Sequence, residues 1–109
     1  MNLNILGTLY TVEELTREED PALENMDGYC DKTTKRIVIS TRSPDSNLGD
    51  WEVYRRKILR HEIIHAFLFE SGLHECWEHG FGHDETYVDW IAAQHPKLHA
   101  VFVEAGCES

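Results

Sequence analysis

The chain has 109 residues, 41% of them hydrophobic, and carries a formal net charge of −10. This length suits one globular domain with one modest core, so we expect residues 1–109 to form a single domain. The acidity argues against nucleic acid as a partner, because phosphates favour clusters of Lys and Arg. No apolar run approaches the roughly 20 residues that a membrane span requires, and residues 1–4 show no basic start of a secretory signal. We therefore expect a cytoplasmic protein without a membrane partner.

The three cysteines are Cys30, Cys76 and Cys107. Their number is odd and no C-x-x-C pair is present, so neither a disulfide framework nor a cysteine zinc finger is indicated. Reduced thiols are the simplest interpretation.

The first 40 residues predict a small antiparallel sheet. Residues 9–12 (LYTV) have the β-branched and aromatic content of a strand, and Pro21 closes that segment. Asp27-Gly28 is a turn signal, and residues 29–40 predict a hairpin whose second strand is the apolar run 36–40. Packed beside the first strand, this hairpin gives a sheet of three antiparallel strands.

The rest of the chain predicts helices. Asp50 is a suitable N-cap for a long helix that should end at Gly72, with Leu73 packing back as in a Schellman cap. A second helix should begin near Asp84 and end before Pro96, which can itself open a short C-terminal helix. We expect Tyr87 and Trp90 on the second helix to be packing residues. The resulting fold class is α+β, with the sheet packed on two main helices and a short third one.

Residues 61–65 read HEIIH, which fits the H-E-x-x-H pattern of zinc-dependent peptidases. Positions i and i+4 lie one above the other on a helix, so His61 and His65 can offer two imidazole nitrogens to one metal. Glu62 projects beside the metal and can take a proton from metal-bound water. The alternative is a helix with two hydrogen-bonded histidines. The apolar run that continues the motif disfavours it, because buried stripes rarely carry such groups without a use.

A catalytic zinc site usually has three protein ligands and one position for water. Glu85, in the first turn of the second helix, is the best candidate for the third ligand, because an antiparallel second helix brings that turn back over the first. Val88 and Ile91 form an apolar stripe near the side of Glu85, so packing points its carboxylate inward. The alternatives are a plain acid at a helix N-terminus, or a third histidine, His83 or His79.

These residues resemble a known family. The run 60–66 (RHEIIHA) and the pattern Glu85-x-x-Val88-Asp89-x-Ile91-Ala92 are similar to the ImmA/IrrE-like metallopeptidases, which are small, gluzincin-type and often phage or prophage encoded. The resemblance covers roughly residues 28 to 95. It implies a zincin-like core of one sheet and two helices, with His61, His65 and Glu85 binding Zn²⁺. Because the 109 residues include no helix-turn-helix segment and no large substrate domain, regulation and substrate cannot be carried over.

The predicted function is hydrolysis of peptide bonds in a protein substrate, with Glu62 as general base and then as acid towards the leaving amine. Asp89 can orient a ligand histidine or serve only at the surface. His83 can donate to the oxyanion or play no catalytic part. The remaining loop residues His74, Cys76 and His79 fit no standard metal-site spacing. A zinc-binding interaction module without proteolytic activity is the alternative function, and a structural domain without metal leaves the HEIIH motif unexplained.

Overall fold

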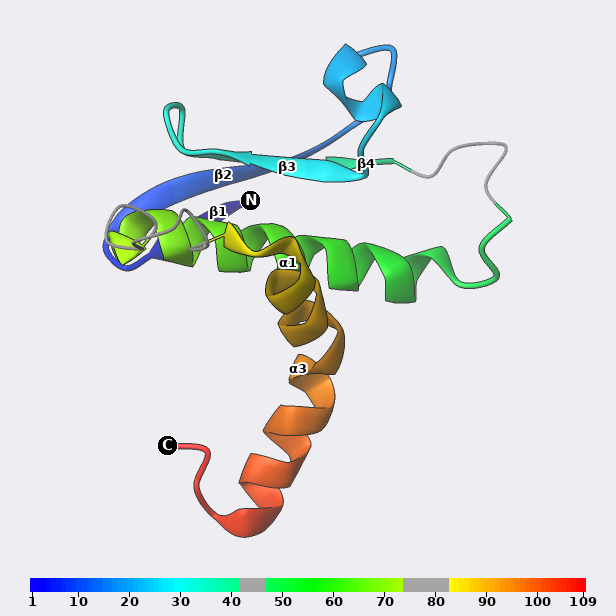
Figure 1. The fold of residues 1–109 in the computed structure, drawn as a ribbon. Helices are drawn as coiled ribbons and strands as arrows, with labels where there is room; N and C mark the ends of the chain where they lie inside the picture. Colours follow the sequence, from blue (N-terminus) through cyan, green and yellow to red (C-terminus); the bar gives the residue numbers. More distant parts are fainter. Residues whose placement is uncertain (42–46, 74–82) are drawn as a thin grey trace.

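The computed structural model describes residues 1–41, 47–73 and 83–109, and in it a sheet, one long helix and a second long helix follow one another from top to bottom (Figure 1). Strands β1 (Asn2–Ile5), β2 (Thr8–Leu15), β3 (Gly28–Asp31) and β4 (Arg36–Ser40) form the sheet, with the 3-10 helix η1 (Pro21–Glu24) between β2 and β3. The helices are α1 (Trp51–Glu70) and α3 (Glu85–Ala105). The α+β class is confirmed.

The sheet has four strands in the order β1-β2-β4-β3, and it is mixed. The prediction of three antiparallel strands is therefore wrong in number and in pairing. Leu6 and Gly7 both adopt positive φ, 51° and 92°, and this tight turn divides the first segment into β1 and β2. The hairpin of β3 and β4 is antiparallel as predicted, but it docks with β4 parallel to β2 and leaves β3 at the sheet edge.

The centre of the core is strand β4. Its consecutive residues Ile37, Val38 and Ile39 are almost fully buried, as expected for a central strand covered on both faces. Ile37 and Ile39 belong to the cluster that also contains Ile58 and Ala66 of α1. Helix α1 therefore buries one face against the sheet, and another part of its surface contacts α3.

Helix α1 begins where the sequence predicted. The carboxylate of Asp50 accepts a hydrogen bond from the backbone N–H of Val53 at 3.2 Å, which caps the helix. The helix ends at Glu70, and Gly72 has a φ of 77°, so the predicted left-handed turn is confirmed. Leu73, by contrast, is exposed.

The prediction of two helices divided at Pro96 is wrong, because α3 runs through this residue as one helix. Asp84 caps its start by accepting from Thr86 and Tyr87, and Gly106, with a φ of 73°, caps its end. A proline inside a helix has no N–H for the carbonyl four residues earlier, here that of Ala92. Arg60 of α1 donates its Nε–H to this carbonyl oxygen at 2.6 Å. The hydrogen bond lost within α3 is thus replaced from α1.

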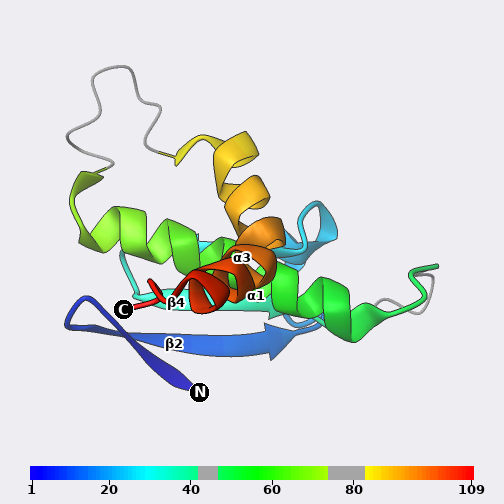
Figure 2. The same ribbon diagram turned by 90° about the horizontal axis from the view of Figure 1, so that it is seen from below.

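Helix α3 begins beside α1 and runs away from the sheet, so that its C-terminal half extends beyond the body of the molecule (Figures 1 and 2). Val88 and Ala92 are buried where the helices meet. Tyr87 and Trp90, which were expected to pack, are exposed instead. Within the described residues, neither helix is long and apolar enough to cross a membrane.

At its C-terminal end, α1 is held to the sheet by Glu70. The carboxylate accepts from the hydroxyl of Tyr10 at 2.7 Å, from Lys35 Nζ at 2.7 Å and from Thr8 Oγ1 at 2.9 Å. The hydrogen bonds from Lys35 and Tyr10 lower the pKa of Glu70 from 4.5 to about 2. This one side chain thus connects the helix to β2 and to the β3–β4 turn.

We expect Glu70→Gln to lower the free energy of unfolding at pH 7. Because the folded-state pKa is depressed, the stabilisation is fully present above about pH 4.5 and is lost as the pH falls towards 2. Urea denaturation of both proteins at pH 7, 5 and 3 measures this. Glu108→Gln, which removes an exposed acid, is the control. An equal deficit at pH 7 and pH 3 contradicts the assigned ionic contact.

Arg60→Met should destabilise the fold by about 1.5–3 kcal/mol, because the carbonyl of Ala92 loses its charged donor. In a Pro96→Ala background residue 96 has an N–H that can bond the carbonyl of Ala92 within α3. There Arg60→Met should lower the free energy of unfolding by about 1 kcal/mol less than in the parent. A double-mutant cycle from urea denaturation gives this coupling, with Arg56→Met, an exposed arginine of the same helix, as the control. A coupling near zero means that Arg60 does not compensate for Pro96.

Candidate metal centre

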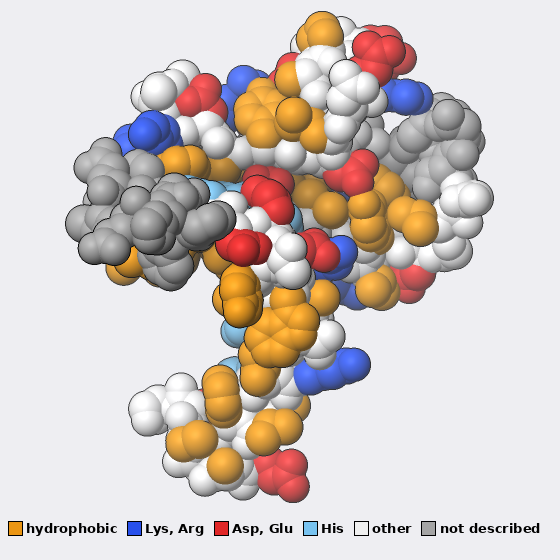
Figure 3. Space-filling view, viewed as in Figure 1, with side chains coloured by type: hydrophobic (Ala, Val, Ile, Leu, Met, Phe, Trp, Pro, Cys, Tyr) orange, Lys and Arg blue, Asp and Glu red, His pale blue; other side chains and the backbone are white. Residues whose placement is uncertain are grey.

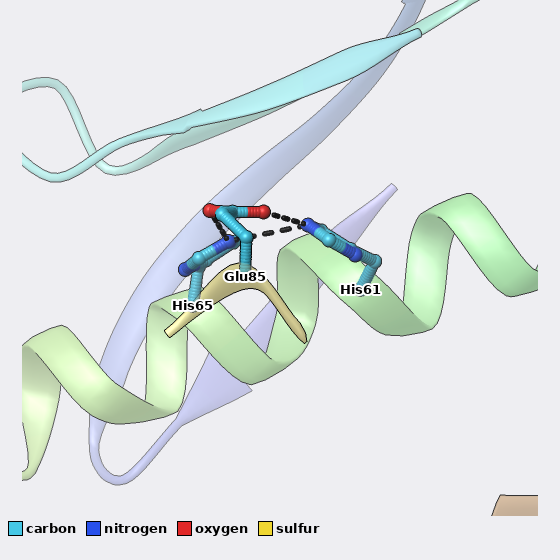
Figure 4. A group of neighbouring side chains, drawn as sticks. All are labelled: His61, His65 and Glu85. Carbon is cyan, nitrogen blue, oxygen red and sulfur yellow. Dashed lines mark hydrogen bonds and ion pairs between the residues drawn. The ribbon is translucent and has the colours of Figure 1, made fainter. Parts of the chain in front are cut away.

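His61, Glu62 and His65 lie on consecutive turns of α1, and Glu85 is the first residue of α3. The helical spacing of four residues brings both imidazoles to one face of α1. The start of α3 lies opposite them, so His61, His65 and Glu85 point towards one another (Figure 4). The structure therefore brings together the three side chains that the sequence predicted as ligands.

The distances between the three side chains suit a single small cation. His61 Nε2 is 3.2 Å from His65 Nε2 and 3.0 Å from Glu85 Oε2, and His65 Nε2 is 2.9 Å from Glu85 Oε1. A tetrahedral zinc ion bonded at about 2.0–2.1 Å holds its ligand atoms about 3.3–3.4 Å apart. The donor set, two imidazoles and one carboxylate, also suits zinc. The residues present thus fit the metal, although binding itself stays a prediction.

The far side of each imidazole has its own contact. Nδ1 of His61 lies 3.3 Å from Asp89 Oδ1, which also accepts from Lys57 Nζ at 3.1 Å. His61 faces a carboxylate at both ring nitrogens, Asp89 at Nδ1 and Glu85 at Nε2. If Nδ1 carries the single proton of the neutral ring and donates it to Asp89, the lone pair of Nε2 is directed at the cluster. This arrangement is the usual support for a metal-binding histidine. Asp89 is therefore placed to orient His61.

His83 lies behind the second imidazole. Its Nδ1 is 2.7 Å from Nδ1 of His65, and the two imidazole rings are nearly parallel with centroids 5.0 Å apart. The centroid of the Phe69 ring lies 4.2 Å from that of His83. With the His65 Nδ1 proton donated to His83, the Nε2 lone pair of His65 also faces the cluster. The sequence offered His83 as an oxyanion donor or a third ligand. The structure places it against a candidate ligand instead.

Burial sets the protonation of this region. It lowers the pKa of His65 below its usual value, which favours the neutral imidazole that a metal requires. Glu62 is 6% exposed, and burial raises the pKa of its carboxyl from 4.5 to about 7, with the charge of Glu85 adding to the shift and that of His61 opposing it. A carboxyl group with a pKa near neutrality can both accept and release a proton.

The cluster opens into a cavity of about 380 Å³ between α1, the start of α3 and the edge strand β3. Histidine and acidic side chains are visible side by side at the surface between the sheet and the start of α3 (Figure 3). The cavity is lined by His61, Glu62, His65, Phe69, His83 and Glu85, and by Met26, Gly28, Tyr29 and Cys30 from the sheet side. The side chains of the cluster are therefore reachable from solvent and lie next to a sheet edge.

Sequence reasoning missed two groups of site residues. Lys57, which contacts Asp89 at 3.1 Å, was not singled out from the sequence, although its position one turn before His61 was the available signal. Tyr29 and Cys30 were expected only as strand residues, and nothing local indicates that β3 borders the cavity. His74, Cys76 and His79 lie outside the described residues.

Comparison of the chain with protein-family models, with curated proteins and with solved structures finds no significant match.

We expect Glu85→Ala to weaken zinc binding by more than about tenfold, because it removes a candidate ligand. Asp89→Ala should weaken zinc binding by about tenfold, because it removes the contact that orients His61. Competition against a chelating dye at pH 7 measures both. Glu104→Ala removes an exposed carboxylate from the far end of the same helix and serves as the charge-matched control. If Glu85→Ala binds zinc as tightly as this control, the third ligand is another residue.

Proposed function

We propose that this chain is a zinc-dependent metallopeptidase that hydrolyses peptide bonds of a protein substrate. The observation that carries the proposal is the buried carboxyl group of Glu62 beside three converging ligand atoms at the wall of an open cavity. A buried carboxyl group is normally paired with a positively charged group or serves a functional role, because burial disfavours its ionised form. Here the use is proton transfer at the mouth of the site.

In the proposed reaction His61, His65 and Glu85 hold the metal. When bound, zinc lowers the pKa of water to about 7 and polarises a carbonyl oxygen. Asp89 and His83 fix the orientation of the two imidazoles through their Nδ1 atoms. Lys57 in turn holds Asp89. The chain thus supplies a ligand set whose directions are fixed from behind.

Glu62 moves the proton. As a carboxylate it takes a proton from the attacking water, and as a carboxylic acid it gives that proton to the nitrogen of the departing amine. Burial raises the pKa of this carboxyl to about 7 in the metal-free chain, and a cation held by the cluster would favour the carboxylate, which is the form that accepts the proton. A binding module that only holds zinc has no need of such a group at this position.

The edge strand β3 favours an extended peptide as the substrate. In the described part of the chain β3 pairs only with β4, and its residues line the same cavity as the cluster. An extended peptide can add to such an edge through backbone hydrogen bonds, which recognise a chain without depending on its sequence. The scissile bond then passes close to Glu62.

The resemblance of the HEIIH run and of the pattern at residues 85–92 to ImmA/IrrE-like enzymes supports the same proposal and suggests the family, with zinc as the cofactor. The net charge of −10 separately disfavours nucleic acid as a partner. The α+β class agrees with that family, although the order and pairing of the strands was not expected. The proposal rests on the site and not on the resemblance, because fold and function do not follow from short motifs.

Glu62→Gln tests the proposal, because glutamine keeps the shape of the side chain but cannot accept a proton. We expect the variant to bind zinc as tightly as the parent and to cleave a mixed peptide library at least about a hundredfold more slowly. Chelator competition and mass spectrometry of the products give the two values. Equal cleavage by parent and variant contradicts the role of Glu62. Zinc binding without cleavage by the parent makes the chain a zinc-binding interaction module.

A further inference from the structure

A second cavity, of about 430 Å³, lies at the other end of β3, where η1, the end of β4 and the start of α1 meet. Met26, two residues before β3, lines this cavity as well as the cavity of the metal cluster. The two cavities are therefore neighbours along the sheet edge. Nothing in the proposed reaction uses the second one.

Strand β3 and helix α1 run in the same direction, one above the other (Figure 1). Near their starts the hydroxyl of Tyr54 donates to Asp27, and further along Cys30 lines the cluster cavity together with Glu62. Gly28 lies between these two points. A Cβ atom at Gly28 would be 3.2 Å from Ile58 of α1 and 2.9 Å from the carbonyl oxygen of Val38. A peptide that adds to the edge of β3 and continues past Met26, which lines both cavities, can reach both of them.

The separation of the cavities can be expressed in residues of such a peptide. Tyr54 and His61 are seven positions apart and Trp51 and His65 fourteen, which corresponds to about 10 and 21 Å along a helix. An extended strand rises about 3.3 Å per residue. The second cavity thus lies about three to six peptide residues from the scissile bond.

The lining of the second cavity is amphipathic. Trp51 and Tyr54 form an aromatic pair with centroids 5.5 Å apart, and Leu23, Met26 and Leu48 add apolar surface. The charged groups in the described lining are the carboxylates of Glu24 and Asp27 and the guanidinium of Arg17. The lining is acidic on balance, as is the chain with its net charge of −10.

We propose that this cavity is a specificity subsite for the long basic side chain of a substrate residue, Arg or Lys, about three to six positions from the scissile bond. Such a side chain has an apolar stem that can lie along Trp51 and Met26, and a cationic head that can reach Glu24 and the face of an aromatic ring. The cation is also attracted by the net charge of the chain. The inference rests on the proposed function in taking a peptide as the substrate, and it adds the substrate class.

The test uses alanine-rich peptides that carry a hydroxamate at one end, because this group chelates the site metal and fixes the register. Two series, with the hydroxamate at the C-terminus or at the N-terminus, carry a single Arg at each position from two to seven residues away. Norleucine at the same positions is the apolar control. Affinity for the zinc-loaded protein is measured by fluorescence polarisation.

In one of the two series we expect Arg, at a position between three and six, to bind about tenfold more tightly than Ala or norleucine, through a combined ion pair and cation–π contact. Trp51→Ala and Glu24→Gln should each reduce this gain, and Trp51→Phe should largely keep it. Val53→Ala, an exposed residue of the same helical turn outside this cavity, should leave it unchanged. Circular dichroism confirms that each variant is folded.

The inference is overturned if no position in either series prefers Arg, if norleucine binds as well as Arg, or if the preference survives in Trp51→Ala and Glu24→Gln. These outcomes are independent of the cleavage test with Glu62→Gln, because hydroxamate binding requires no hydrolysis. A preference for Arg in a protein that cleaves nothing retains the subsite and rejects the peptidase. Cleavage by a protein that shows no preference for Arg retains the peptidase and rejects the subsite.

Discussion

Strand β3 passes close to α1 at Gly28, and the position of the candidate site depends on this contact. A Cβ atom here would lie 2.9 Å from the carbonyl oxygen of Val38 and 3.2 Å from the side chain of Ile58. A larger residue would force β3 away from α1, and such overpacking typically costs about 1–3 kcal/mol. Because β3 is the sheet edge, its closeness to α1 is also what brings a strand-like binding surface beside His61 and Glu62.

The second requirement is that α3 crosses α1 at the correct place. Val88 and Ala92 are buried on one side of α3, and Glu85 and Asp89 lie near the same side at helical spacing. When this side packs on α1, both carboxylates therefore contact His61. The hydrogen bond from Arg60 to the carbonyl of Ala92 fixes the same crossing. One contact region thus serves stability and the candidate site together.

The parts of the structure that the sequence predicted depend on local chemistry. The HEIIH spacing, the cap at Asp50 and the left-handed turn at Gly72 each involve residues within a few positions of one another. The convergence of Glu85 on the histidines was predicted from an apolar stripe, which reports the side on which a helix packs.

The failed predictions depend on partners distant in the sequence. The parallel pairing of β2 with β4 joins segments about 25 residues apart, and no local signal specifies it. Pro96 is a helix breaker by its own chemistry, and only the donor on α1 makes the continuous helix possible. Tyr87 and Trp90 are aromatic residues of the kind that usually pack, but they lie on other sides of α3 than Val88 and Ala92, which pack on α1, and they are therefore exposed.

The candidate site concentrates titratable side chains in a small volume. Two imidazoles and the carboxylate of Glu85 converge within 4.8 Å, and the buried carboxyl group of Glu62 lies beside them. Glu85 contacts both Nε2 atoms, whereas burial strips hydration from Glu62 and raises its pKa. The chain holds them in place from outside the cluster, through Asp89 with Lys57 behind His61 and through His83 behind His65. The Glu70 contacts fix the same helix at its far end. Because these contacts already hold the two histidines, binding of a zinc ion would order few further side chains and would cost little conformational entropy. The contacts behind the histidines would therefore contribute to zinc affinity without touching the metal.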